Sequence, residues 1–403
     1  MDKLDKRAKM SYHSTPDWNP QDAAVLHDQR RAYDEMRERC PVAHSDFLGW
    51  SLFRHQDIVA VLADPATYSN ATKHPAIPNG LNPPEHTSYR RILEPYFQPE
   101  QMTTFEPLCR SIAVDVIQAL SKQDELEFIS EFAQPFSLKT HCAFLGWPLE
   151  TWERLSSWTQ ATQAVAFSRD SGTGAMLAQE FARYVTEALQ IRRAVGTTAT
   201  NDLTTSLIRT TVDGAPLSDE EIVSILRNWT AGHGTIVAAL GILVFYLAEH
   251  PTVQQQLRDE PDRLPVALDE ILRADGPLVA NPRTVVHDAE IGGQKIKAGE
   301  KLSLNWIAAN RDARTFDAPD EVRFDRDPTQ SMLFGAGIHN CLGAPLARLV
   351  MRVALKELLA RTVTISLSST EPPSRAVYPS NGFEAMSVNF RWGKPDDGLP
   401  ISD

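Results

Sequence analysis

The chain has 403 residues and a mass of 44.9 kDa, enough for roughly two to three typical domains or for one large enzyme. Apolar residues make up 42% and charged residues 23% of the sequence, which excludes a disordered chain, a collagen and a disulfide-rich miniprotein. The 40 basic and 52 acidic side chains give a formal net charge of −12. A nucleic acid is therefore not an expected partner, because phosphates are neutralised by clustered Lys and Arg.

The sequence predicts a cytoplasmic protein that does not bind a membrane. No run approaches the ~20 apolar residues of a membrane span. Residues 1–9 carry six charges of mixed sign and no apolar core, unlike a secretory signal. Four cysteines are too few for a disulfide framework in a chain of this length, and we interpret Cys40, Cys109 and Cys142 as buried free thiols.

Helical patterns dominate the first part of the chain. Residues 20–39 predict a helix that ends before Cys40-Pro41, residues 49–54 a short strand, and residues 55–62 a second helix stopped by Asp64-Pro65. Residues 66–84 contain four prolines and predict a long loop of the kind that often carries function.

The clearest element is a long central helix. Ser218 and Glu221 form a capping-box signature, and an apolar helical pattern then continues to Pro251. That is about 31 residues, or roughly 46 Å of helix. Its centre contains Gly232 and Gly234, each of which costs about 1 kcal/mol in a helix. A local kink, a close approach by another group and tight helix packing are all compatible with these glycines.

The last third of the chain changes character. Residues 284–286, a turn at Gly292-Gly293 and residues 296–299 predict short strands joined by a hairpin. Residues 316–330 predict coil, and residues 344–361 predict a second buried helix. The expected fold class is mostly α with minor β.

The chemistry is expected around Cys341. Residues 334–343 read Phe-Gly-Ala-Gly-Ile-His-Asn-Cys-Leu-Gly, and a helix with Pro345 in its first turn follows. Glycines allow a backbone to approach a ligand closely, and a helix N-terminus stabilises a thiolate. A lone cysteine cannot hold a structural zinc ion, which needs four protein ligands. The loop therefore suits a cysteine that binds the metal of a flat cofactor.

This pattern, Phe-Gly-x-Gly-x-His-x-Cys-x-Gly, resembles the haem-binding loop of the cytochrome P450 monooxygenases, and the resemblance extends from about His55 to Leu367. It implies the fold of that family, a triangular helical domain with a long central helix and small sheets. It also implies haem b with Cys341 as the axial ligand, in a loop that includes Phe334, Gly335 and Gly343. Residues 1–403 would form one haem domain, with about residues 1–20 as an N-terminal extension and no fused reductase domain.

Further segments resemble the family in its order. Glu270-Ile271-Leu272-Arg273 is similar to its Glu-x-x-Arg motif, which implies a buried structural network, and we expect Arg323 as the third partner with Arg326 as the rival. The resemblance also implies that His86 and Arg90, four residues apart on one helix face, bind a haem propionate. By the same resemblance, Arg283 and His339 point at propionates.

The resemblance assigns the central helix to oxygen chemistry. The family usually has Ala/Gly-Gly-x-Asp/Glu-Thr where this chain has Ala231-Gly232-His233-Gly234-Thr235. Thr235 is the expected partner of dioxygen, but Gly234 replaces the acid that helps to relay protons. We hypothesise that His233, ionisable near neutral pH, or water admitted beside Gly234 relays protons instead. The alternative is that His233 faces a neighbouring helix and has no catalytic role.

The implied reaction uses two electrons and two protons to reduce one atom of O2 to water while the other enters the substrate. A separate ferredoxin or flavodoxin with its reductase is the expected electron source for a monomer. Arg348, Arg352 and Lys356 recur at helical spacing and are candidates for its docking face, although a solvated helix face is equally compatible.

The substrate is expected to be small and hydrophobic or aromatic, and to undergo hydroxylation or O-demethylation. By resemblance, the substrate pocket would include Phe167, Trp229, Val279, Asn281 and Phe383. Two other functions fit the same cofactor. A peroxygenase would use peroxide and need no partner, and a haem sensor or carrier would need neither Thr235 nor a closed pocket.

Overall fold

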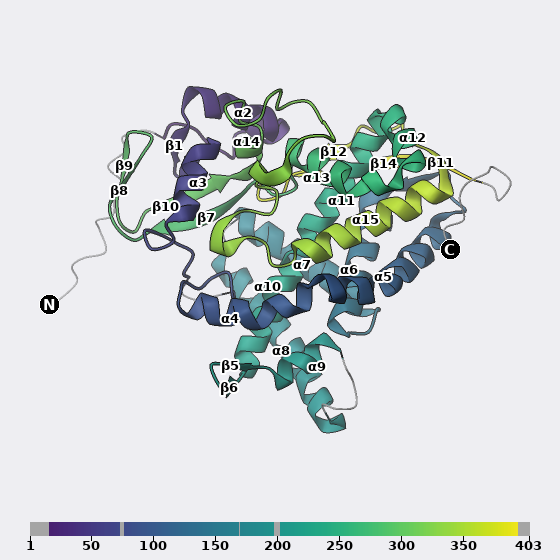
Figure 1. Ribbon diagram of the computed structural model, residues 1–403, viewed down its shortest axis with the longest axis horizontal. Helices are drawn as coiled ribbons and strands as arrows, with labels where there is room; N and C mark the ends of the chain where they lie inside the picture. Colours follow the sequence, from purple (N-terminus) through teal and green to yellow (C-terminus); the bar gives the residue numbers. More distant parts are fainter. Residues whose placement is uncertain (1–15, 73–75, 169, 197–201, 394–403) are drawn as a thin grey trace.

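The computed structural model describes residues 16–72, 76–168, 170–196 and 202–393 of the chain. Helices form most of the molecule, and a small sheet lies at one side of the helical body (Figure 1). The predicted fold class, mostly α with minor β, is confirmed. Residues 1–15 of the expected N-terminal extension lie outside the described residues.

The helices are short near the N-terminus and longer in the centre of the chain. They are α1 (Ala23–His27), α2 (Gln29–Arg39), α3 (His55–Ala63), α4 (Glu85–Leu93), α5 (Pro99–Leu120), α6 (Gln134–Leu145), α7 (Thr151–Ser168), α8 (Ser171–Val195), α9 (Leu203–Arg209), α10 (Asp219–Ala231), α11 (His233–Glu249), α12 (Pro251–Asp259), α13 (Leu264–Ala274), α14 (Trp306–Asn310) and α15 (Ala344–Arg361). A π-helical turn (Ile129–Ala133) leads into α6. Short 3-10 turns follow α4 and α12 and also lie in the coil between α14 and α15.

The largest sheet has the strand order β1-β2-β10-β7-β3. Its strands are β1 (Val42–Ser45), β2 (Gly49–Leu52), β10 (Lys301–Asn305), β7 (Ala280–Val285) and β3 (Tyr68–Ser69). A second sheet has the order β11-β14-β4, formed by β11 (Thr362–Leu367), β14 (Ser387–Trp392) and β4 (Glu125–Glu127). The two-stranded pairs are β5 (Thr211–Val212) with β6 (Ala215–Pro216), β8 (Ala289–Ile291) with β9 (Gln294–Ile296), and β12 (Ser374–Arg375) with β13 (Phe383–Ala385).

The predicted hairpin at Gly292-Gly293 is confirmed as the turn between β8 and β9. Both glycines have positive φ values, 56° and 80°, as a two-residue type I′ turn requires. The helix predicted over 20–39 is wrong in one respect, because Asp28 interrupts it at φ −144° and its side chain accepts the Arg31 N–H to cap α2. A local side-chain bond of this kind competes with helix continuation.

The long central helix is present and broken once. Its capping box is formed in both directions, since Ser218 accepts the Glu221 N–H and Glu221 accepts the Ser218 N–H. The break lies at Gly232, which separates α10 from α11. Within the described residues, 219–249 is the one stretch whose length and composition would suit a membrane span, and 61% of its most apolar window is buried inside the protein.

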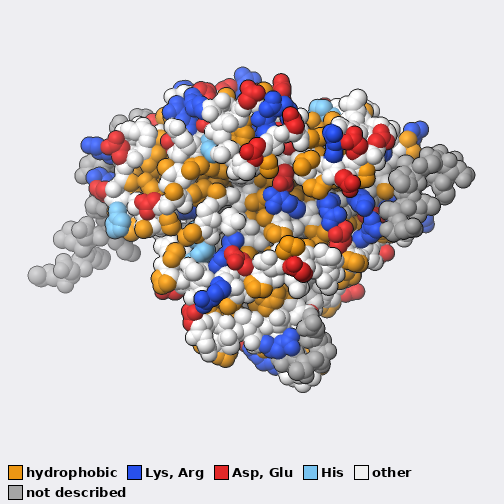
Figure 2. Space-filling view, viewed as in Figure 1, with side chains coloured by type: hydrophobic (Ala, Val, Ile, Leu, Met, Phe, Trp, Pro, Cys, Tyr) orange, Lys and Arg blue, Asp and Glu red, His pale blue; other side chains and the backbone are white. Residues whose placement is uncertain are grey.

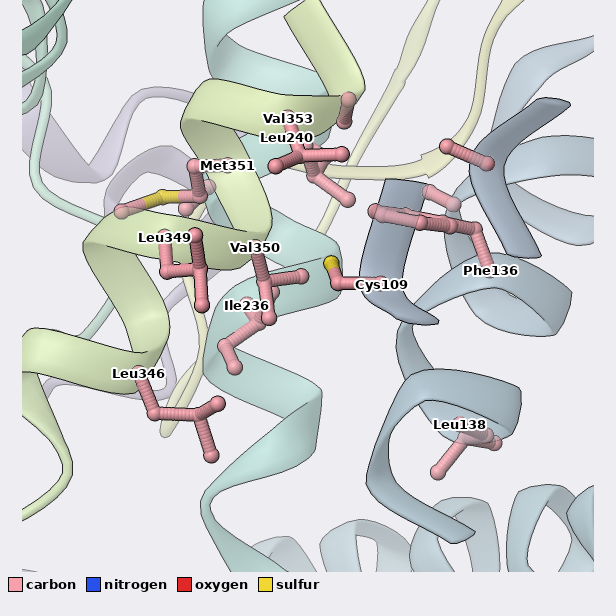
Figure 3. Packing of buried hydrophobic residues seen from close by; sticks show 14 of the residues in the cluster. Cys109, Phe136, Leu138, Ile236, Leu240, Leu346, Leu349, Val350, Met351 and Val353 are labelled. Atoms are coloured by element: carbon pink, nitrogen blue, oxygen red, sulfur yellow. The ribbon is translucent and has the colours of Figure 1, made fainter. Parts of the chain in front are cut away.

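The main hydrophobic core lies between α15, α11, α6 and α5. Figure 3 shows α15 presenting Leu346 and Val350 toward Ile236 of α11, with Cys109 of α5 beyond them. Cys109 and Cys142 are fully buried thiols, as predicted, whereas Cys40 is only half-buried. This core fixes the helix that follows the Cys341 loop against the central helix.

Candidate active site

One cavity of about 600 Å³ lies between the centre of α10–α11, the Cys341 loop and β7. Ten of the side chains and glycines that the sequence singles out line it: Trp229, His233, Thr235, Asn281, Arg283, Phe334, Gly335, His339, Cys341 and Gly343. These positions come from three separate stretches of the chain, 229–235, 281–283 and 334–343. The fold therefore brings together most of the predicted site.

Two glycines allow the Cys341 loop to adopt its backbone conformation. Gly335 and Gly337 have φ values of 69° and 70°, a region that side chains rarely adopt. A Cβ on Gly337 would also lie 2.9 Å from the Leu62 carbonyl oxygen of α3. The Cys341 N–H donates to the Phe334 carbonyl at 2.8 Å, which closes the loop just before α15 begins.

Cys341 lines the cavity, and its side chain is exposed there. Burial raises the pKa of its thiol, whereas the backbone N–H groups of Gly343 and Ala344, at the start of α15, act in the opposite direction. These N–H groups belong to a helix N-terminus, whose positive end favours a thiolate. A metal ion bound here would deprotonate the thiol outright.

A cluster of basic side chains lies beside this loop, and within the described residues Arg283, His86 and His339 form no ion pair. Arg283 is 6% exposed, and the one hydrogen bond of its side chain is to the neighbouring Pro282 carbonyl. Burial lowers the pKa of Arg283 to about 10. Burial also lowers the pKa of His339, to about 3, and the neighbouring His86, Arg283 and Arg90 act in the same direction. Both ring nitrogens of His339 and Nε2 of His86 are buried without a hydrogen-bond partner among the described residues. Buried donors of this kind fit the two carboxylates of a haem.

Two residues that are predicted to bind the haem carboxylates, His86 and Arg90, do not line the cavity. The His86 ring contacts the His339 ring, with centroids 4.4 Å apart. Arg90 donates to the Asn340 carbonyl and side chain at 2.7 and 2.8 Å and pairs with Glu94. In this structure Arg90 therefore braces the residue before Cys341 and does not itself line the cavity.

Residues 231–235, which the resemblance assigns to oxygen chemistry, lie on two different faces of the central helix. Thr235 and His233 line the cavity, but His233 is 3% exposed and its Nδ1 bonds to Ser137 of α6 at 3.0 Å. Burial lowers the pKa of His233 to about 3, so the expectation that it ionises near neutral pH is wrong. A Cβ on Gly234 would lie 2.3 Å from Nε2 of Gln163 on α7, so the space left by the missing side chain holds an amide.

The predicted Glu270 network is buried and contains a different arginine. Arg273 forms two bonds to Glu270, at 2.7 and 2.9 Å. The third side chain is Arg326, whose Nε donates to Glu270 at 2.9 Å, while Arg323 contributes only its backbone N–H. The preference for Arg323 is therefore wrong, because its side chain turns outward to Asp317. Burial would raise the pKa of Glu270, but these bonds outweigh it and lower the pKa.

Three predicted pocket residues are not among those that line the cavity. Phe167 packs toward Phe47, with ring centroids 6.4 Å apart. Val279 is 1% exposed in the core beside the sheet, and Phe383 is buried against Phe245 under α11. Val279 and Phe383 are thus part of the buried core, whereas Phe167 is half-buried at the end of α7.

The cavity wall also includes part of the long loop that the sequence marks as functional, together with residues of α6, which the sequence does not reveal. His141 and Phe144 of α6 line it, as do residues of the 69–80 loop. The Ile77 N–H of that loop donates to Ser224 at 3.0 Å, and Asn228 donates to the Ile77 carbonyl at 3.3 Å. These two contacts join residues 147 and 151 positions apart in the chain, and no local sequence signal marks them.

The candidate docking face on α15 carries paired charges. Arg348 forms bonds of 2.8–3.0 Å to Asp269, and Arg352 forms bonds of 2.7 and 3.0 Å to Glu106. Figure 2 shows basic and acidic side chains interspersed over the face that α15 crosses in Figure 1. The predicted basic patch is therefore partly neutralised by its neighbours.

Comparisons with known proteins agree with this geometry. The sequence model described as Cytochrome P450 matches residues 167–377. Relatives include the erythromycin C-12 hydroxylase of Saccharopolyspora erythraea, 32% identical over 81% of this chain and 85% of that protein. The cyclomarin C epoxidase CymV of Salinispora arenicola is 31% identical over 83% and 89%. Among solved structures, CYP109E1 from Bacillus megaterium in complex with testosterone has a TM-score of 0.83 at 25% identity and covers 92% of this chain and 99% of its own.

Proposed function

The chain belongs to the cytochrome P450 family of haem-dependent monooxygenases, and we propose that it uses haem b and O2 to oxidise a small, largely apolar substrate. Cys341 would bind the iron, and Arg283, His339, His86 and Arg90 would neutralise the two haem carboxylates. When bound, a thiolate-ligated haem supplies the O2 activation that no side chain can provide. The support is the group of buried side chains beside Cys341, Arg283, His339 and His86, which form no ion pair among the described residues.

The protein's own contribution is orientation and exclusion of water. Phe334, Gly335 and Gly343 would let the loop backbone lie against the cofactor, because two of the three carry no side chain there. Trp229 and Asn281 would face the substrate, in a wall that is mainly apolar with a few amides, which suits a small hydrophobic or aromatic molecule. We infer hydroxylation or O-demethylation as the reaction, and the hydroxylase and epoxidase relatives support C–H or C=C oxidation.

Proton delivery needs a route to Thr235, since reduction of one oxygen atom to water consumes two protons. Both His233 and Gly234 were candidates for this route, and the low pKa of His233 removes it as an ionisable relay. Gln163 is exposed, and its amide lies against Gly234, one residue from Thr235. We infer that water held by this amide carries protons past Gly234.

Electrons would come from a ferredoxin or flavodoxin with its reductase. Residues 1–403 would form one haem domain that acts as a cytoplasmic monomer. The partner would dock on the α15 side of the Cys341 loop, where Arg352 and Lys356 remain part of a mixed-charge surface. Long-range attraction to an acidic partner would raise the association rate more than the final affinity.

The experiment that tests this function is the spectrum of the purified, reduced protein with carbon monoxide. A thiolate-ligated haem gives the red-shifted band of the family, and Cys341→Ser should abolish it, whereas the matched Cys40→Ser variant should keep it. A parent protein without pigment, or with an imidazole-type spectrum, contradicts the proposal. Turnover with NADH, ferredoxin and reductase, compared with turnover by peroxide, separates a monooxygenase from a peroxygenase, and absence of both indicates a sensor or carrier.

A further inference from the structure

The break in the central helix is fixed by contacts that the oxygen chemistry does not itself require. At Gly232 the helical pattern shortens, because the Gly232 N–H bonds to Trp229 O and the Thr235 N–H bonds to Gly232 O, each three residues back. Gly232 and Gly234 disfavour a helix by about 1 kcal/mol each. A segment with such weak intrinsic preference needs outside contacts to hold one geometry.

Those contacts come from two residues one turn apart on α6. His141 Nε2 lies 2.9 Å from Thr230 Oγ1, on the α10 side of the break. Ser137 Oγ lies 3.0 Å from His233 Nδ1, on the α11 side. The side chains are sealed from solvent, with Ser137 and Thr230 at 0%, His141 at 1% and His233 at 3% exposure.

The hydrogen bonds of Thr230 determine which ring nitrogen of His141 carries a proton. Thr230 has one hydroxyl proton, which it donates to the Leu226 carbonyl at 2.8 Å. Its oxygen must then accept from His141, so His141 carries its proton on Nε2. Among the described residues His233 is the hydrogen-bond partner of the Ser137 hydroxyl, and the His233 tautomer sets which of the two groups donates.

The two imidazoles also contact each other directly. Their ring centroids are 3.8 Å apart and their planes are inclined by 44°. Burial lowers the pKa of His233 to about 3. Burial also lowers the pKa of His141 well below its ordinary value, and the neighbouring His233 acts in the same direction. Two rings this close repel each other when both are charged, so the contact is incompatible with protonation of both histidines.

We propose that Ser137 and His141 form a clamp, the α6 clamp, which holds both sides of the Gly232 break and thereby positions Thr235 on the cavity wall. The clamp joins the last turn of α10 to the first turn of α11, and Thr235 is two residues beyond His233. In the clamp, His141 and Ser137 are positioning residues that act through the helix, although the ring of His141 also lines the cavity. The proposal rests on the proposed function for its chemical meaning, but its test does not.

Amide hydrogen exchange of residues 232–236 in the substrate-free holoprotein tests the clamp directly. His141→Phe keeps the ring volume and removes the bond to Thr230, and His141→Gln restores a donor where Nε2 lies. Ser137→Ala removes the other bond with a minimal change in volume, and it serves if His141→Phe does not fold. Thr140→Ala is the control, because Thr140 is buried on the same helix beside the Cys109 thiol.

We expect exchange to become about five- to tenfold faster in His141→Phe and Ser137→Ala, the effect of losing one buried hydrogen bond. His141→Gln should stay within about twofold of the parent, as should Thr140→Ala. The carbon–oxygen stretching band of the reduced, carbon monoxide-treated protein should shift in the first two variants only. Unchanged exchange in Ser137→Ala, or equal acceleration in Thr140→Ala, overturns the clamp, whereas a parent without a thiolate-type spectrum overturns the proposed function and leaves the exchange result standing.

Discussion

Removal of Arg326 should destabilise the protein far more than removal of Arg323. The Arg326 side chain donates to Glu270 at 2.9 Å, and both side chains are 8% exposed. It also donates to the carbonyls of Asp317, Ala318 and Glu321. Arg326→Ala thus withdraws one charged bond from a buried carboxylate and leaves three carbonyls with one donor fewer.

The size of the loss follows from what Glu270 retains. A hydrogen bond to a charged group contributes about 1.5–3 kcal/mol, while complete isolation of a buried charge costs about 3–5 kcal/mol. Glu270 keeps both bonds from Arg273 and the Arg323 N–H, so the lower range applies. We expect Arg326→Ala to lower the free energy of unfolding by about 2–3 kcal/mol.

Arg323→Ala is the matched control in the same loop. Its side chain is 38% exposed and pairs at 3.3 Å with Asp317, which is 87% exposed, and an exposed pair contributes about 0–1 kcal/mol. Its backbone bond to Glu270 survives the substitution. Urea unfolding at pH 7, followed by tryptophan fluorescence, measures both variants. Equal losses, or a larger loss for Arg323→Ala, would refute the assignment of Arg326 to the network.

Three other predictions concern protons and electrons. The pKa values of His141 and His233 in the folded protein are below the ordinary value, so the unfolded chain binds more protons than the folded protein below pH 6.5. The free energy of unfolding should therefore fall by about 1 kcal/mol per histidine as the pH is lowered from 6.5 to 5.5, and it should be constant above pH 7. Urea unfolding at these pH values checks this, and an equally steep fall in His141→Gln would contradict it. Gln163→Ala should raise the peroxide released per NADH about two- to fivefold, because slower protonation lets reduced oxygen escape; Gln160→Ala on the same helix is the control, and an unchanged yield rejects the Gln163 route. Arg352→Glu, which also sets two acids side by side at Glu106, should slow reduction by ferredoxin severalfold in stopped-flow experiments without altering ligand-induced spectral shifts; unaltered reduction would exclude this face.

Local signals were sufficient for several elements of the fold. The capping box at Ser218, the paired glycines at 292 and 293 and the apolar pattern of α15 each lie within a few consecutive residues, and the corresponding elements form as predicted. The break at Asp28 was missed because a short polar side chain within a helical pattern can either face solvent or cap the next turn. That choice depends on the packing of α2 against the sheet side of the molecule.

The site divides in the same way. The Cys341 loop is one contiguous motif, so its residues meet as predicted. Arg323 and Arg326 stand three residues apart in coil, and only the path of that coil decides which side chain turns inward to Glu270. His141 and Gln163 reach the central helix from α6 and α7, some 70 to 90 residues earlier in the chain, and neither carries a sequence pattern that would announce the contact.

The tether between the 69–80 loop and α10 has a mechanical consequence. Ile77 is bonded through both its N–H and its carbonyl to side chains one turn apart on α10, Ser224 and Asn228. The stretch of loop around Ile77 can swing outward only by losing two bonds, each contributing about 1 kcal/mol, or by drawing the first half of the central helix with it. Because that half ends at the Gly232 break, we expect a large ligand that displaces the loop to change the helix geometry at Gly232, three residues before Thr235.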